Sequence, residues 1–404
     1  MSAATVRRVS DAVLHEALRG LRDAFGRAAE LAVEAPGRVN LIGEHTDYNQ
    51  GLVLPCAIDR GTLAVAASRS DTRLRVYSTA LGAVGELEPG RSVRGRGWLD
   101  YVAGVAEAFR SETLPVAGLD IAVASGLPRE SGLSSSAALE VAIATLLDAA
   151  SGLGLPAAER ARLAWRAETE FVGVPCGRMD QLASALGRRD VALRIDCRDL
   201  VWRAVPLPGE RLRLLIVDSG VRRRLADGDY GLRRRECEAA LVQARERAVV
   251  PADTESWRDV ELERLAELER RLDARLARRA RHVLTENGRV DALADALARG
   301  DLERAGALVR QGMASLRDDF EVSVPELDAL CALGDAAPGC FGSRLTGAGF
   351  GGCTLHLVDA ERADSVAAAI RSGFAARFGR EPALLEVRPA EGARVLGKPS
   401  SRPA

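Results

Sequence analysis

Lysine is almost absent from this chain of 404 residues: the only one is Lys398, in the polar C-terminal tail, and the other basic residues are arginines. A Walker-type phosphate loop needs a lysine after its glycines, and a Schiff-base enzyme needs one as its nucleophile. The chain offers no plausible candidate for either role. Any phosphate that it binds is therefore expected to contact backbone amides, serines, arginines and a metal ion.

Other features are scarce as well. The four histidines lie far apart, without a local zinc-ligand spacing. The seven cysteines are scattered, odd in number and without a Cys-x-x-Cys pair, which favours reduced thiols in a cytoplasmic protein. We find no signal-peptide core and no apolar run of about 18 residues. The formal net charge of −1 does not favour nucleic acid or a membrane surface as a partner. A small molecule or another protein is the expected partner.

The chain is long for a single hydrophobic core, so we expect two domains. Hydrophobic residues make up 47% of the sequence, which is enough to fill both. Pro206-Leu-Pro-Gly-Glu210 predicts a turn between two strand-like segments. We place the domain boundary there, which gives domains of residues 1–205 and 206–404.

The first functional signal lies at residues 128–140. An apolar run at 119–124 predicts a strand, and the alanine- and leucine-rich stretch after Ser136 predicts a helix. The connecting loop contains three consecutive serines, Ser134 to Ser136. Small residues let a ligand approach the backbone, and the N–H groups of a helix N-terminus attract an anion such as phosphate. The alternative is that the serines only cap the helix.

A second polar segment lies between two apolar, strand-like runs. Within twelve residues it contains Arg38, Asn40, Glu44, His45, Asp47 and Asn49. Charged groups held near a core usually need partners, and a sugar would supply them through its hydroxyl groups. An ordinary surface loop is the alternative.

These segments resemble motifs of a known family. Gly37-Arg-Val-Asn-Leu-Ile-Gly-Glu-His-Thr-Asp-Tyr-Asn49 is similar to the galactokinase signature, and Gly132-Leu-Ser-Ser-Ser-Ala-Ala138 resembles the ATP loop of the GHMP kinase superfamily. The glycine-rich segment 342–354 follows as the third superfamily motif. The resemblance implies an α+β fold with the active site in a cleft between two domains. It also implies ATP-dependent phosphorylation of the anomeric hydroxyl of α-D-galactose, the first committed step of galactose catabolism.

The resemblance further implies roles for individual residues. Asp180, in a Gly-x-Pro-Cys-Gly-x-Met-Asp-Gln motif, would be the catalytic base or a hydroxyl-orienting group; a helix cap is the alternative. Arg38 would keep Asp180 ionised or stabilise the moving phosphoryl group. Ser136 and Glu168 are the implied Mg²⁺ ligands. The implied sugar contacts are Glu44, His45, Asp47, Gly177 and Tyr230. The implied ATP contacts are Trp98, Gly132, Leu133, Ser134, Ser135, Ser136 and Ala137, although Trp98 could instead belong to the core.

Other functions remain open at this point. The acceptor could be another sugar, such as N-acetylgalactosamine or arabinose. Some galactokinase-like proteins are inactive sugar sensors that bind a transcriptional repressor, but the serine loop is intact here. Another GHMP kinase, such as mevalonate kinase, fits poorly with residues 37–49. We expect a monomer or a weak oligomer.

Two stretches depart from the family pattern. Arg129-Glu130-Ser131 stands where relatives usually carry glycines, and we expect the Glu130 carboxylate to point away from the nucleotide. Arg223 replaces a common histidine. Elsewhere, residues 57–76 predict paired strands with a polar turn at 69–71, and the leucine spacing over 259–281 predicts one helix with a single buried stripe.

Overall fold

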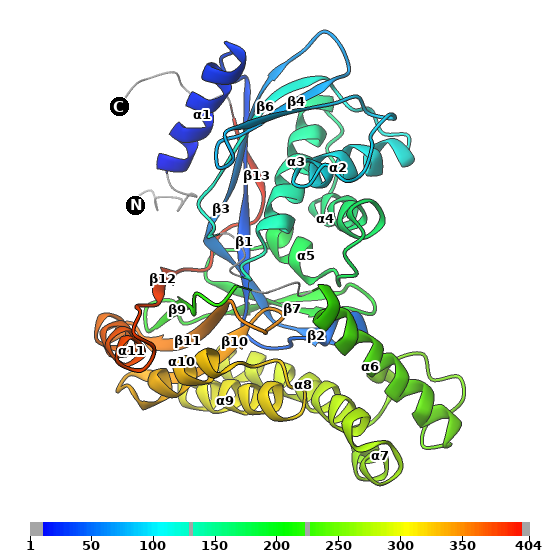
Figure 1. Cartoon of the computed structure of the whole chain (residues 1–404), viewed down its shortest axis with the longest axis vertical. Coiled ribbons are helices and arrows are strands. Elements are labelled where there is room, and N and C mark those ends of the chain that lie inside the picture. Colours follow the sequence, from blue (N-terminus) through cyan, green and yellow to red (C-terminus); the bar gives the residue numbers. More distant parts are fainter. Residues whose placement is uncertain (1–10, 129–131, 223–226, 398–404) are drawn as a thin grey trace.

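The computed structural model describes residues 11–128, 132–222 and 227–397. The expectations for Arg129-Glu130-Ser131 and for Arg223 fall outside these ranges. The fold is α+β, as predicted. Figure 1 shows an upper half built on one long sheet, and a lower half in which smaller sheets lie over a layer of helices.

The upper sheet has six strands in the order β13-β1-β3-β6-β4-β5. Their bounds are β1 (Leu31–Asn40), β3 (Pro55–Ser68), β4 (Leu74–Ser78), β5 (Ala83–Leu87), β6 (Leu119–Ser125) and β13 (Arg394–Gly397). The predicted pairing of strands within 57–76 is wrong, because β3 and β4 each pair with β6, which lies between them. Almost every residue of β6 is buried, and a strand covered on both faces belongs inside a sheet.

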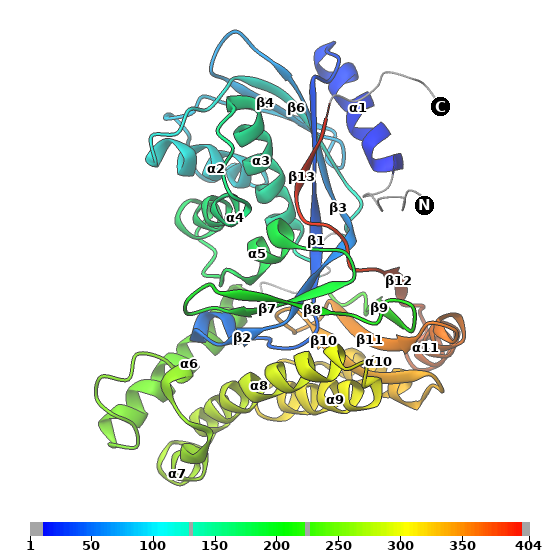
Figure 2. The ribbon, with the colours of Figure 1, turned by 180° about the vertical axis from the view of Figure 1, so that it is seen from behind.

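Helices cover both faces of this sheet (Figures 1 and 2). On one face lies α1 (Asp11–Phe25), whose Val13, Ala17 and Leu21 pack against β3 and β6 as an amphipathic helix should. On the other face lie α2 (Leu99–Ser111), α3 (Ser135–Ser151), α4 (Ala157–Arg166) and α5 (Met179–Leu186). Of these, α3 packs against the sheet and against the other three helices, which explains its apolar composition on all sides.

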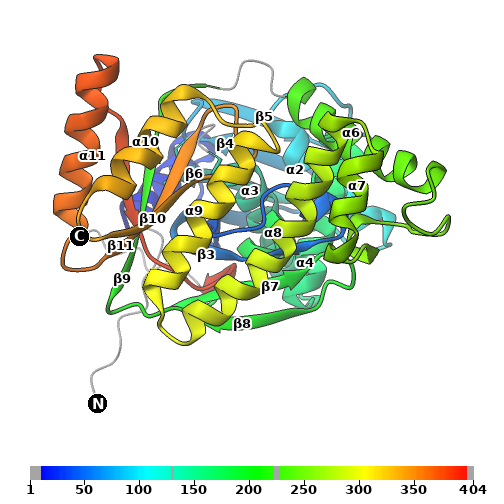
Figure 3. The same ribbon diagram turned by 90° about the horizontal axis from the view of Figure 1, so that it is seen from below.

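The lower half contains two sheets. One has the order β10-β11-β9-β12 and consists of β9 (Leu212–Asp218), β10 (Cys340–Thr346), β11 (Cys353–Asp359) and β12 (Ala383–Val387). The other is formed by β2 (Leu52–Val53), β7 (Val191–Asp196) and β8 (Trp202–Pro206). The helices are α6 (Asp227–Glu246), α7 (Leu265–Arg271), α8 (Ala274–Ala298), α9 (Leu302–Asp318), α10 (Pro325–Ala336) and α11 (Ala363–Phe378). Seen from below, α8 and α9 run beside each other across this half (Figure 3).

The single helix predicted over 259–281 is also wrong, because the chain turns between α7 and α8. Leu272 is extended and buried at this corner. The Asp273 backbone N–H donates to Gln243 Oε1 of α6 at 2.8 Å, and Gln243 Nε2 donates back to the Asp273 carboxylate at 2.9 Å. Contacts from a helix more than twenty residues away thus override the local leucine periodicity.

The two halves share a hydrophobic core. One cluster of buried residues joins Leu41 and Leu54, near the lower end of the upper sheet, to Ile216 of β9 and Leu293 of α8. The boundary at residue 205 stays a prediction, because β13, from the end of the chain, returns to pair with β1. Within the described residues, no helix is long and apolar enough to cross a membrane.

Candidate active site

A cavity of about 570 Å³ lies between the two halves. The upper half contributes side chains from β1, α3 and α5, and the lower half contributes α6 and the loop after β10. The cavity brings together most of the predicted site residues: Arg38, Glu44, His45, Asp47, Gly132, Ser134, Ser135, Ser136, Glu168, Gly177, Asp180 and Tyr230.

Arg38 and Asp180 form the centre of the cavity. Arg38 Nε and Nη2 donate to the two carboxylate oxygens of Asp180, each at 2.7 Å, and Nη1 donates to the Gly132 carbonyl at 2.6 Å. The pairing of β1 with β3 is irregular between Pro36 and Arg38. There a Cβ on Gly37 would lie 2.6 Å from the Leu133 carbonyl oxygen, so only glycine allows the serine loop to approach β1 this closely. Sequence-distant motifs therefore meet at one ion pair.

The serine loop lies against this pair. Ser134 precedes the first residue of α3, and its side chain makes no capping hydrogen bond. Its hydroxyl instead donates to Asp180 Oδ2 at 2.5 Å. Simple capping therefore does not account for Ser134. Ser135 and Ser136 form the first turn of α3 and line the same cavity, so the N-terminus of the helix faces it.

Glu168 lies beyond the serines, in the π-helical turn Ala167–Val172. Gln181 Nε2 donates to one Glu168 oxygen at 2.5 Å and to Glu140 at 3.1 Å. Burial, together with the nearby Asp180 carboxylate, raises the pKa of Glu168, while a hydrogen bond from Ser136 lowers it. Burial and Glu168 raise the pKa of Glu140 well above its usual range. This end of the cavity thus holds closely spaced oxygen atoms and carboxyl groups with raised pKa values.

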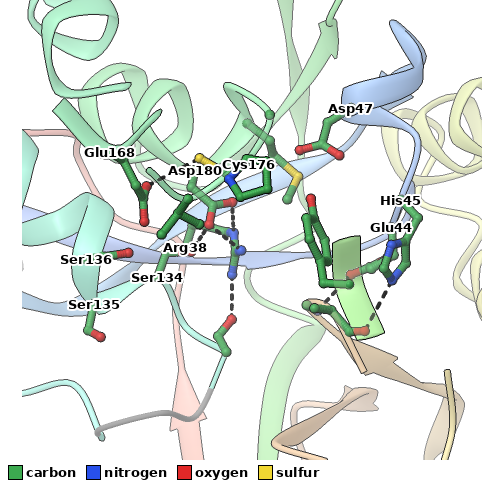
Figure 4. A pocket seen from close by; sticks show the side chains of 18 of the residues that line it. Arg38, Glu44, His45, Asp47, Ser134, Ser135, Ser136, Glu168, Cys176 and Asp180 are labelled. Carbon is green, nitrogen blue, oxygen red and sulfur yellow. Dashed lines mark hydrogen bonds and ion pairs between the residues drawn. The ribbon is translucent and has the colours of Figure 1, made fainter. Parts of the chain in front are cut away.

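Asp47 lies at the opposite end (Figure 4), and Gly177 and Tyr230, which contact or face it, also line the cavity. Burial, together with the nearby Asp180 carboxylate, raises the pKa of Asp47 to about 6. A Cβ on Gly177 would lie 2.0 Å from an Asp47 carboxylate oxygen, so no larger residue fits beside it. Tyr230 comes from α6, and its ring centroid lies 5.5 Å from that of His45.

His45 and Glu44 complete this end. His45 Nδ1 lies 2.9 Å from the Tyr48 hydroxyl, and Nε2 lies 3.2 Å from the Ala348 carbonyl oxygen. Glu44 pairs with Arg344 and accepts the Gly347 backbone N–H at 3.2 Å. Figure 4 shows Ser134 to Ser136 and Glu168 on one side of the Arg38–Asp180 pair, with Glu44, His45 and Asp47 on the other.

Three predicted ATP contacts do not line the cavity. Leu133 and Ala137 are buried in the core. Trp98 lies at the start of α2 and packs against the core of the upper half, so its contact with adenine stays a prediction. Tyr101, one turn later in α2, lines the cavity instead. No sequence motif marked Tyr101 as a site residue. The third glycine-rich motif could have indicated Arg344, Gly347 and Ala348, which contact the site residues Glu44 and His45.

Family models match three parts of the chain. A galactokinase galactose-binding signature matches residues 21–68. A model of the GHMP kinase N-terminal domain matches residues 100–188, and one of the GHMP kinase C-terminal domain matches residues 293–376. The chain is 47% identical over 360 residues to the galactokinase of Chloroflexus aggregans, covering 88% of this chain and 91% of that protein. It is 42% identical to the human galactokinase, covering 95% and 97% of the two chains.

Solved structures give the same result at the level of the fold. The crystal structure of the Lactococcus lactis galactokinase complexed with galactose superposes with a TM-score of 0.88 at 31% identity, covering 93% of this chain and 98% of that one. The Methanococcus jannaschii mevalonate kinase superposes with a TM-score of 0.66 at 19% identity, covering 90% and 100%, and shares the fold.

Proposed function

The chain belongs to the galactokinase family of GHMP kinases and catalyses the ATP-dependent phosphorylation of galactose, and we propose that the transfer takes place in the cavity around Arg38 and Asp180, onto the anomeric hydroxyl. The observation that carries this proposal is the Arg38–Asp180–Ser134 contact set between two chemically different ends of one cavity. Phosphoryl transfer depends on positioning and on charge stabilisation, and this arrangement supplies both.

Asp180 accepts the proton of the attacking hydroxyl or orients that hydroxyl. Among the described residues that line the cavity, His45 is the only histidine and there is no lysine; the His45 ring nitrogens face the Tyr48 hydroxyl and the Ala348 carbonyl oxygen. Arg38 binds both carboxylate oxygens and the Gly132 carbonyl, so its donors are directed at these groups. This geometry favours a role for Arg38 as the ion-pair partner that fixes the orientation of the Asp180 carboxylate, rather than as a group that contacts the moving phosphoryl group.

The N-terminus of α3 and its serines bind the phosphates of ATP, because the backbone N–H groups and the helix dipole favour negative charge there. We propose Ser136 and Glu168 as ligands of Mg²⁺. Both side chains line the cavity and present oxygen atoms. Among the described residues no group of three or more histidine, cysteine or acidic side chains is arranged to hold a metal alone. This suits Mg²⁺, which is commonly bound by one or two side chains and substrate phosphates. When bound, it would offset phosphate charge.

Galactose binds at the other end, against Glu44, His45, Asp47, Gly177 and Tyr230. Carboxylates accept several hydrogen bonds each, and the imidazole and phenol can both accept and donate. The close packing of Gly177 against Asp47 sets the width of this end. Location in the cytoplasm and a monomeric or weakly oligomeric state are part of this proposal.

The test is a coupled assay of ADP release over a sugar panel of galactose, N-acetylgalactosamine and arabinose, with and without Mg²⁺. We expect turnover with galactose that requires Mg²⁺ and a product phosphorylated at the anomeric oxygen, identified by ³¹P NMR. Negligible turnover of galactose beside rapid turnover of another sugar would overturn the choice of acceptor. Tight sugar binding without any turnover would indicate a sensor.

A further inference from the structure

The third glycine-rich motif, residues 342–354, contacts the sugar end of the cavity. Gly347 and Ala348 belong to its wall, and their backbone groups meet Glu44 and His45. In the same motif, Arg344 lies in β10 with its side chain fully buried. A fully buried arginine is rare unless it is paired, so the groups around it indicate what it does.

Arg344 connects the sugar motif to the lower half. Its guanidinium pairs with Glu44 and lies 3.4 Å from Glu286 of α8, and it donates to the Leu41 carbonyl oxygen at 3.1 Å. Glu286 in turn accepts the Gly43 backbone N–H at 2.9 Å. Two residues from the lower half therefore hold Gly43 and Glu44 in place, although neither of them lines the cavity.

We propose that Arg344 is a positioning residue for sugar recognition: its guanidinium, placed between Glu44 and Glu286, keeps the Glu44 carboxylate ionised and oriented toward galactose. The third motif therefore supports sugar binding indirectly, because its Arg344 and Gly347 hold the Glu44 carboxylate. This inference rests on the proposed role of Glu44 as a sugar contact. Both Glu44 oxygens already accept one hydrogen bond, from Arg344 and from Gly347. When the group is ionised, each oxygen can still accept from a sugar hydroxyl, whereas protonation turns one oxygen into a donor and reduces that capacity.

The charges around Glu44 are closely balanced. Burial and the Glu286 carboxylate raise the pKa of Glu44, Arg344 and, more weakly, Arg38 lower it, and the net result is a pKa of about 7. From α8, His282 Nε2 donates to the Glu44 carbonyl oxygen at 3.1 Å, and Arg289 pairs with Glu286 at 2.7 Å. Because the pKa of Glu44 is raised, its carboxylate is lost as the pH falls through about 7. Small changes in neighbouring charge therefore change how much of the enzyme can bind sugar at neutral pH.

The first experiment compares Arg344→Gln with the unmodified protein by measuring kcat/KM for galactose from pH 5.5 to 9.5. Loss of the cation raises the pKa of Glu44 by roughly one unit or more. The acidic limb of the profile should move to higher pH by that amount. At pH 7 kcat/KM for galactose should fall by roughly fivefold or more, and it should recover at pH 9. The KM for ATP should stay within about twofold. A purely structural defect would not be repaired by raising the pH.

The second experiment uses Glu286→Gln, which keeps the shape and the acceptor for Gly43 but removes a negative charge. It should move the acidic limb in the opposite direction, to lower pH. The Glu286→Gln measurement tests the proposal even if Arg344→Gln does not fold, because Glu286→Gln leaves Arg344 paired with Glu44. Arg344→Lys serves as the charge-retaining control and should leave the limb near its original pH.

Two results would overturn the proposal. The first is a Glu286→Gln protein in which the acidic limb of the pH profile of kcat/KM stays at its original pH. The second is a folded Arg344→Gln protein whose kcat/KM for galactose at pH 7 matches that of the unmodified protein. If the unmodified protein does not phosphorylate galactose, the proposed function fails instead. The two failures are therefore distinguishable.

Discussion

Two residues in the cavity wall adopt left-handed backbone conformations without being glycine: His45 at φ 63° and Ser134 at φ 58°. Such conformations cost about 1–3 kcal/mol each and persist where the surroundings hold them in place. His45 is held by Tyr48 and the Ala348 carbonyl, and Ser134 by its hydrogen bond to Asp180. At the scale of single residues, the strained backbone therefore lies at two of the proposed ligand contacts, whose side chains must point in fixed directions.

Replacing Asp180 tests the proposed chemistry. Asp180→Asn keeps the size of the side chain but removes the proton acceptor, so kcat should fall by roughly a hundredfold to ten-thousandfold. Galactose binding, measured by isothermal titration calorimetry, should persist, because the sugar contacts lie on other residues. A variant that keeps most of its turnover would show that Asp180 is not the base.

Gly177 gives a second test at this scale. Gly177→Ala places a Cβ against the Asp47 carboxylate, which must move. The KM for galactose should rise by roughly tenfold or more, with the KM for ATP nearly unchanged, because only the sugar end is displaced. Gly288→Ala in α8 is the matched control, since a Cβ there meets nothing within 4 Å; its kinetics should not change. An unaltered KM for galactose in Gly177→Ala would contradict the placement of the sugar.

At the scale of elements, buried charge fixes α6, the helix that carries Tyr230. Arg279 of α8 is almost fully buried and donates to Glu236 of α6 at 2.7 Å and to Glu321 at 2.6 Å. It also binds the Asp319 carbonyl at the end of α9. One guanidinium therefore links α6, α8 and the end of α9. The cavity wall at Tyr230 depends on this link, because α6 packs against α8.

Arg279→Met should lower the free energy of unfolding by about 1–3 kcal/mol, because buried Glu236 loses its closest cation, although it keeps Arg233 at 3.2 Å, and the Asp319 carbonyl loses its donor. Arg278→Met is the neighbouring control: Arg278 is about one-third exposed and pairs with Glu321 at 3.1 Å, so its loss should cost less than about 1 kcal/mol. Urea denaturation followed by circular dichroism measures both. An equal decrease in the free energy of unfolding for the two variants would show that buried Arg279 stabilises the fold no more than partly exposed Arg278 does.

At the scale of the whole molecule, the last described strand ties the end of the chain to its beginning. β13 pairs with β1, and Arg394 of β13 forms an ion pair with buried Glu34 of β1. β1 continues downward to Arg38 and the cavity. Since the two halves also share a core, we expect them to unfold together in one cooperative transition.

A chain that ends after Gly392 would lack β13. It should lose on the order of 3 kcal/mol of stability, because β1 becomes an unpaired edge and buried Glu34 loses Arg394. A chain that ends after Gly397 keeps the strand and is the control; its melting temperature should match that of the full chain. Differential scanning calorimetry measures this directly, and two separate transitions in the full chain would contradict the expectation of joint unfolding.

Part of this protein was determined by the sequence alone. The motifs at 37–49, 132–138 and 173–181 identified the family, the α+β fold and most of the residues that line the cavity. This was possible because those residues lie close together in sequence within short segments, where a polar side chain between apolar runs is visible without any tertiary information. The roles of these residues in binding and catalysis stay predictions.

The remainder was decided by tertiary structure. β6 lies between β3 and β4 because a fully buried strand belongs inside the sheet, and the corner between α7 and α8 is set by Gln243 of another helix. Arg344 contacts Glu44 across 300 positions of sequence. No local periodicity encodes such a contact, since it exists only when the two halves pack and bury both charges together. The sequence by itself therefore determined which chemical groups are present, and the packing of the two halves decided which of them meet.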